Sequence, residues 1–174
     1  MKRLLLTILV ACLASTARAQ TSPLAPGLAG LSFLVGVWSD GNGRVAERGG
    51  TSTGTSVITA EAGGGALLRR DHTSLQDASG RPAGGFDQIM LIYPEGGGLR
   101  ADYADGSHVI HYVSAEVQPG RSVVFASAAR PGAPVFRLRY ELAGPGTLAV
   151  SFAIAAPGAS DFRPIATGTL TRSR

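Results

Sequence analysis

The sequence predicts an all-β protein: an antiparallel up-and-down β-barrel of eight to ten strands, with a short N-terminal helical turn. From residue 35 onward, short runs of alternating apolar and polar residues are separated by Gly, Pro, Asp and Asn about every ten residues, which is typical of a sandwich or barrel. No long stretch has helical periodicity. Successive short hairpins favour a meander, and a long meander removes its two exposed edges most simply by closing on itself.

The first 19 residues read as an export signal. A basic start precedes an apolar run that is too short to span a bilayer, and Ala17 and Ala19 suit a signal peptidase that cleaves before Gln20. We therefore expect a periplasmic or secreted bacterial protein with no membrane span. In a second interpretation the segment ending at Cys12 is a lipobox, which would make the protein a lipoprotein acylated at that cysteine.

Composition excludes several kinds of partner. Removal of the leader takes three of the 16 basic residues, and the remaining 13, all arginine, nearly balance 12 acidic residues. Because those arginines are scattered, we expect no nucleic-acid binding. Cys12 is the only cysteine, so the processed chain would contain no disulfide and no thiolate ligand for a metal.

We expect one barrel domain over residues 31–174, preceded by a flexible lead over residues 20–30. Ten runs are expected to form its strands: 35–40, 51–60, 65–74, 85–93, 98–104, 107–116, 121–128, 136–142, 148–154 and 161–172. The run 51–60 is rich in Ser and Thr, and its small side chains suit a strand that lines an open cavity.

The runs 136–142 and 148–154 form a predicted hairpin around a Gly-Pro-Gly turn. Side chains alternate between the two faces of a strand, so every second residue points inward. The apolar and aromatic face of this hairpin supplies Phe136, Leu138, Tyr140, Val150 and Phe152.

The segment DYADGSHVIHY, residues 102–112, poses the question of a catalytic or metal site. Asp105-Gly106 is a strong two-residue turn signal, which would pair Tyr103 with His108. The inward face would then hold Leu99, Ala101, Tyr103, His108, Ile110 and Tyr112. His111 would face solvent in a cluster with Asp102 and Arg100, so the two histidines could not bind one metal.

For two further strands the sequence does not decide which face points into the barrel. In residues 66–73 the series containing Asp71 and the series containing His72 are similarly apolar. In residues 84–93 the series of Phe86 and Met90 competes with that of Ile89 and Leu91 in the same way.

The segment 31–43, LSFLVGVWSDGNG, places Gly36 two residues before Trp38 at the start of the first strand. It resembles the N-terminal signature of the calycin superfamily, which includes lipocalins, fatty-acid-binding proteins and haem-binding nitrobindins, and it is most similar to small exported lipocalin-like proteins of bacteria. The resemblance implies that the tryptophan packs at the closed end of the barrel under an arginine of the last strand, here Arg172. The nitrobindin pattern also requires a histidine near the C-terminus, and none follows His111, so we expect no haem or other cofactor.

These observations lead us to expect a barrel that binds a small apolar or amphipathic molecule without catalysis. The expected binding residues are Leu99, Tyr103, His108, Ile110, Tyr112, Phe136, Leu138, Tyr140, Val150 and Phe152. Three alternatives remain open: an isomerase or cyclase that uses His108 and a tyrosine, a haem-binding barrel, and a packed barrel without a cavity that acts through protein contacts.

Overall fold

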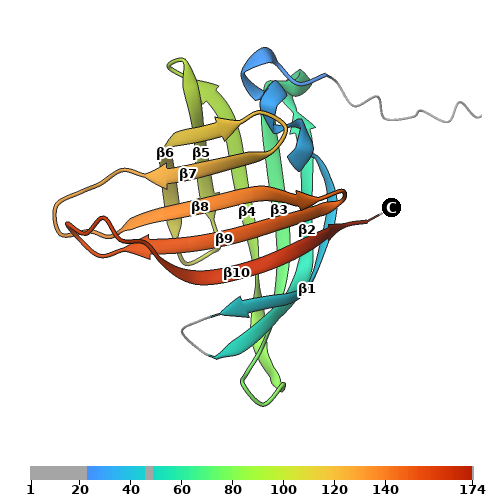
Figure 1. Ribbon diagram of the computed structural model, residues 1–174, viewed down its shortest axis with the longest axis vertical. Helices are drawn as coiled ribbons and strands as arrows, with labels where there is room; N and C mark the ends of the chain where they lie inside the picture. Colours follow the sequence, from blue (N-terminus) through green and yellow to red (C-terminus); the bar gives the residue numbers. More distant parts are fainter. Residues whose placement is uncertain (1–22, 46–48, 174) are drawn as a thin grey trace, which may run out of the picture.

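The computed structural model describes residues 23–45 and 49–173, and within them the chain forms a closed barrel of ten antiparallel strands (Figure 1). This confirms the predicted fold class. The predicted export signal and its cleavage site lie outside the described residues. The strands are β1 Gly36–Val45, β2 Gly50–Glu61, β3 Ala66–Gln76, β4 Pro82–Glu95, β5 Gly98–Ala104, β6 Val109–Gln118, β7 Ser122–Ser127, β8 Val135–Gly144, β9 Thr147–Ala155 and β10 Arg163–Arg172.

Every strand pairs with its neighbours in sequence, and β1 closes the barrel against β10, with Trp38 opposite Arg172. In such a meander the connections alternate between the two ends of the barrel. The turns at 62–65, 96–97, 119–121 and 145–146 therefore lie at one end, and the loops at 77–81, 105–108, 128–134 and 156–162 lie at the other. No helix in the described residues is long and apolar enough to cross a membrane.

A 3-10 helix, η1 Pro26–Leu34, covers the first of these ends and lies at the top of the view in Figure 1. Leu28, Leu31 and Leu34 are completely buried. The backbone fixes η1 to two turns, because the N–H of Ala25 donates to Gly64 O at 2.9 Å and the N–H of Gly120 donates to Gly30 O at 2.8 Å. The expected helical turn is thus present, and it begins at Pro26, inside the stretch that composition suggested as a flexible lead.

Trp38 anchors the closed end of the barrel. Its ring is completely buried, and Nε1 donates to Leu34 O at 2.8 Å. The guanidinium carbon of Arg172 lies 4.2 Å from the ring centroid, and Nη1 and Nη2 donate to the carbonyls of Val35 and Phe33 at 2.6 and 2.9 Å. Gly36 has a φ of +144°, and a Cβ there would collide with Arg172 Nη1, so only glycine lets the arginine approach this closely.

Replacing Arg172 by lysine is expected to lower the free energy of unfolding by about 1–2 kcal/mol, because an ammonium group cannot stack on the indole and donate to both carbonyls at once. Urea denaturation followed by Trp38 fluorescence measures the change. Arg163→Lys, on the exposed face of the same strand, is the matched control and is expected to change stability little. Equal effects of the two variants would contradict the role given to Arg172.

The structure settles the two strands whose faces the sequence left open. On β4, Met90 and Ile92 are buried, whereas Ile89 and Leu91 are 53% and 40% exposed. On β3, Leu67 is buried beside Ile92, and alternation points Arg69 and Asp71 into the barrel as well. Packed side chains fill the half of the barrel next to η1, and β3 runs from this core toward the opposite end.

Candidate functional site: the barrel lumen

A cavity of about 640 Å³ occupies the half of the barrel away from η1. Its wall includes Asp105, Ser107 and His108 from the loop between β5 and β6, together with the ends of β1, β4 and β10. It therefore opens at the end that η1 does not cover. Seven of the ten residues expected to bind a ligand lie on its wall: Tyr103, His108, Tyr112, Leu138, Tyr140, Val150 and Phe152.

The other three expected residues do not line the cavity. Leu99 and Ile110 belong to the packed core at 7% and 9% exposure. Phe136 stacks on Phe152, with ring centroids 5.8 Å apart and an interplanar angle of 11°, so it packs beside a wall residue without lining the cavity itself. The small residues of β2 from Ser52 to Ser56 do form part of the wall, as expected from their low side-chain bulk.

Arg69 lies at the floor of the cavity, where the lumen meets the core. Its guanidinium makes five hydrogen bonds: Nε and Nη2 both donate to Asp71 Oδ2, Nη2 also donates to Gln88 Oε1 at 3.1 Å, and Nη1 donates to Tyr140 Oη at 2.6 Å and to Met90 Sδ at 3.8 Å. The ion pair is buried, with both side chains about 10% exposed. A guanidinium has five N–H groups, so its whole donor capacity is used.

Burial raises the pKa of the three lumen tyrosines. For Tyr140 the pKa rises to about 12, because loss of solvent outweighs the opposing effect of the Arg69 charge and hydrogen bond. For Tyr112 burial also raises the pKa, helped by the nearby Tyr140. For Tyr103 burial and a hydrogen bond to Asp105 act in the same direction. Burial alone would lower the pKa of Arg69, but Tyr140 and Asp71 outweigh it, so the pKa of the guanidinium is raised and the side chain stays charged.

Two buried polar atoms at the cavity have no hydrogen-bond partner among the described residues: Asp71 Oδ1 and Ser56 Oγ. Both residues line the cavity, and they sit directly opposite each other on β3 and β2. Buried polar groups in proteins are nearly always hydrogen-bonded. A polar group of a bound molecule would therefore gain the most binding free energy by forming hydrogen bonds with this pair of atoms.

At the mouth of the cavity, the hairpin differs from the two-residue turn expected at Asp105-Gly106. Tyr103 pairs with Ile110, not with His108, and residues 105–108 form a longer loop. The Asp105 carboxylate holds this loop by accepting the N–H groups of Ser107 and His108 at 3.0 and 2.7 Å. Burial alone would raise the pKa of Asp105, but these bonds and one from the Tyr103 hydroxyl lower it.

The register differs from the expected one by two residues, which leaves the faces of both strands unchanged. Only His108 changes role. It lies in the loop at the rim of the cavity instead of deep between two tyrosines, and its side chain is 72% exposed. Its Nδ1 lies 3.3 Å from Asp105 Oδ1, and Tyr103 donates to the other oxygen of that carboxylate at 3.0 Å.

His111 lies on the outer surface. His111 Nδ1 is 2.6 Å from Asp102 Oδ1 in an exposed pair, and its ring does not converge with that of His108. Arg100 was expected to belong to this cluster, but it does not. Asp102 stands directly opposite His111, and Arg100 Nε instead donates to Glu95 Oε2 at 3.2 Å. No group of three metal-binding side chains occurs among the described residues.

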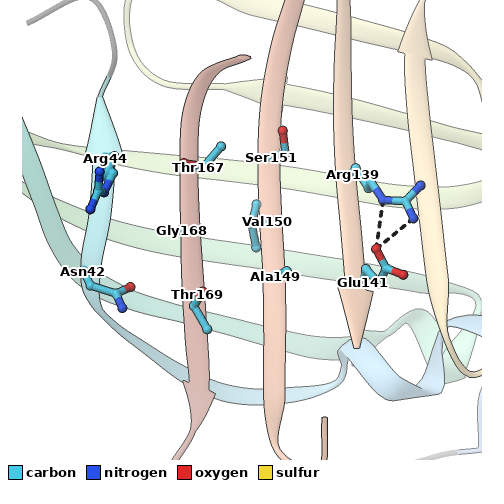
Figure 2. A pocket seen from close by; sticks show the side chains of 10 residues that line it. All are labelled: Asn42, Arg44, Arg139, Glu141, Ala149, Val150, Ser151, Thr167, Gly168 and Thr169. Atoms are coloured by element: carbon cyan, nitrogen blue, oxygen red, sulfur yellow. Dashed lines mark hydrogen bonds and ion pairs between the residues drawn. The ribbon is translucent and has the colours of Figure 1, made fainter. Parts of the chain in front are cut away.

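A second, shallower hollow of about 440 Å³ lies over β8, β9, β10 and β1 (Figure 2). Its borders are Asn42 and Arg44 on one side and the Arg139–Glu141 pair, joined at 2.8 Å, on the other. Between them lie the small polar residues Ser151, Thr167 and Thr169. The lumen is the stronger candidate site, because it is larger and because the two buried polar atoms without a partner among the described residues, Ser56 Oγ and Asp71 Oδ1, belong to its wall.

The sequence pattern did not predict the polar floor of the lumen. Arg69 and Asp71 lie in a run that also contains Arg70 and His72, and a charged residue in a strand normally indicates the solvent face. The one available signal was the absence of a purely apolar face in this strand.

Comparisons with known proteins found similarity only among solved structures. No family model matches the chain, and no curated protein matches it. Among solved structures, one of EF1p2_mFAP2b bound to DFHBI aligns with 84% of this chain and 99% of its own length, at 13% sequence identity and a TM-score of 0.46. The closed ten-stranded meander itself is what supports a calycin-like barrel.

Proposed function

We propose that this protein is an exported lipocalin-like member of the calycin superfamily that binds a small apolar or amphipathic molecule in its lumen without catalysis. One observation carries the proposal. The barrel is packed solid next to η1, whereas its other half holds a cavity of about 640 Å³. Cavities of this size, lined by aromatic and aliphatic side chains with a few polar groups, are typical of small-molecule sites.

Burial of the ligand's carbon surface would supply most of the affinity, at about 25 cal/mol for each Å² removed from water. The apolar wall for this contact comes from Leu138, Val150 and Phe152, and the polar floor comes from Arg69 and its partners. Binding in this cavity requires no conformational change of the protein, because the site is already formed.

Filling the lumen tests the proposal. Nile red, a neutral dye that fluoresces in apolar surroundings, is expected to bind the purified protein. Val150→Trp places a large ring in the cavity and is expected to weaken dye binding about tenfold or more, because the ring occupies ligand space.

Ala149→Trp is the matched control, since Ala149 precedes Val150 on β9 and borders only the outer hollow, whereas Val150 borders both the outer hollow and the lumen (Figure 2). It is expected to leave dye binding unchanged. Thermal melts of both variants verify that they fold. If the wild type fails to bind the dye, or if both tryptophans have the same effect, the lumen is not the binding site.

A further inference from the structure

The Arg69 guanidinium, the one cation buried at the floor of the described lumen, is not available to a ligand. All five of its N–H groups are directed at Asp71, Gln88, Tyr140 and Met90. A ligand carboxylate would have to displace Asp71, which already holds Nε and Nη2 together. Displacement would leave the Asp71 carboxylate buried without its counter-charge, at high cost.

The charges around the cavity also oppose an anion. Its wall contains three carboxylates, those of Asp40, Asp71 and Asp105, and one guanidinium, that of Arg69. His72 and His108 also lie on the wall, but their side chains are 64% and 72% exposed, where water screens any charge they carry. An anionic head group inside the lumen would therefore face a net negative charge in a poorly solvated space, and an ammonium group would lose its hydration there.

The unsatisfied atoms at the floor are acceptors. Asp71 Oδ1 can only accept a hydrogen bond, and Ser56 Oγ can both donate and accept. Their residues are cross-strand partners. Each atom exposes less than 1 Å², so a head group that satisfies them must be small and the two side chains must turn slightly toward the lumen to meet it. A hydroxyl fits these demands, because it can donate to Asp71 and accept from Ser56 at the same time.

We infer that the lumen selects an uncharged amphipathic molecule carrying a small hydrogen-bond donor, such as an alcohol, over a fatty-acid-type anion. The inference rests on the proposed function and specifies the class of its ligand. The hydroxyl lies against Asp71 Oδ1 and Ser56 Oγ, and the apolar body of the ligand extends along Leu138, Val150 and Phe152 toward the mouth.

Displacement of Nile red by four molecules built on a ten-carbon chain tests this inference: decanol, decyl methyl ether, decanoate and decylamine. At about pH 8 decanoate carries a negative charge and decylamine a positive one. Decanol is expected to bind at least about tenfold more tightly than decanoate. It is also expected to bind about three- to tenfold more tightly than the ether, which matches it in lacking charge but has no donor.

Ser56→Ala removes the hydroxyl that donates to the ligand oxygen, a contact that the alcohol and the ether can both make. It is therefore expected to weaken both ligands and to keep the preference for decanol, which comes from the bond donated to Asp71. Ser151→Ala, in the outer hollow (Figure 2), is the matched control and is expected to leave the affinities for both ligands unchanged. Equal binding of alcohol and ether, or tightest binding of decanoate or decylamine, overturns the inference while leaving the proposed function in place. Failure of the wild type to bind Nile red would instead overturn the proposed function.

Discussion

Replacing Arg69 by leucine is expected to lower the free energy of unfolding by about 3–5 kcal/mol. The change leaves the Asp71 carboxylate at the floor of the lumen, only 11% exposed, with neither its counter-charge nor its hydrogen bonds. It also removes a donor from Gln88 and Tyr140. Chemical denaturation of the wild type and the variant measures the difference, and a shift of the midpoint at constant slope shows that stability alone has changed.

The double variant Arg69→Leu/Asp71→Leu separates the cost of an unpaired charge from the value of the pair. Buried ion pairs gain little over apolar residues of similar size, so the second change is expected to restore most of the lost stability. Arg139→Leu breaks a half-exposed pair with Glu141 on the outside of β8 and is expected to cost less than about 1 kcal/mol. If the double variant is no more stable than Arg69→Leu, the buried charge is not the source of the loss.

The ten strands could be predicted because each leaves a local signature of alternation and turn residues. Their ends were less clear. β4 begins at Pro82 and includes Gly84 and Gly85, which composition marks as turn residues, because its ladder with β3 continues as far as the pair Gln76 and Pro82. Pairing with a neighbouring strand, which is a tertiary interaction, here overrides local propensity.

The predicted register of the β5–β6 hairpin was wrong for a different reason. Asp-Gly favours a two-residue turn by its backbone conformation. In the structure the Asp105 side chain accepts backbone N–H groups from Ser107 and His108 instead, and this local competition lengthens the loop. The prediction of which face points inward was unaffected, because a shift of two residues keeps each side chain on the same face. Tyr103 and Tyr112 therefore line the lumen as expected.

The polar floor of the lumen could not be predicted from local pattern. Arg69 is satisfied by Tyr140, which lies 71 residues away in sequence, and by Gln88 on the next strand. A single strand does not show which charged side chain will find such partners. The aromatic part of the wall was visible, because Tyr and Phe at alternate positions indicate an inward face whatever the exact pairing.

Alkaline titration is expected to unfold the barrel as its tyrosines ionise. The pKa of each of Tyr103, Tyr112 and Tyr140 is raised in the folded state, so the folded chain holds these protons more tightly than the unfolded chain. Below pH 10, the ordinary pKa of tyrosine, both states are protonated and stability does not depend on these groups. Above it the unfolded chain loses protons first, and stability falls by about 1.4 kcal/mol per pH unit for each tyrosine that remains protonated in the fold.

For Tyr140, whose pKa rises to about 12, this loss amounts to about 3 kcal/mol over its window from pH 10 to 12. Phenolate absorbance and β-sheet circular dichroism are therefore expected to change together in this window. Tyr112→Phe is the informative variant, because no hydrogen bond contributes to the pKa of Tyr112. It is expected to match the wild type at neutral pH and to lose stability less steeply above pH 10. Phenolate absorbance that develops fully while the sheet signal stays intact would show that water reaches the lumen tyrosines freely and that their burial does not hold them protonated.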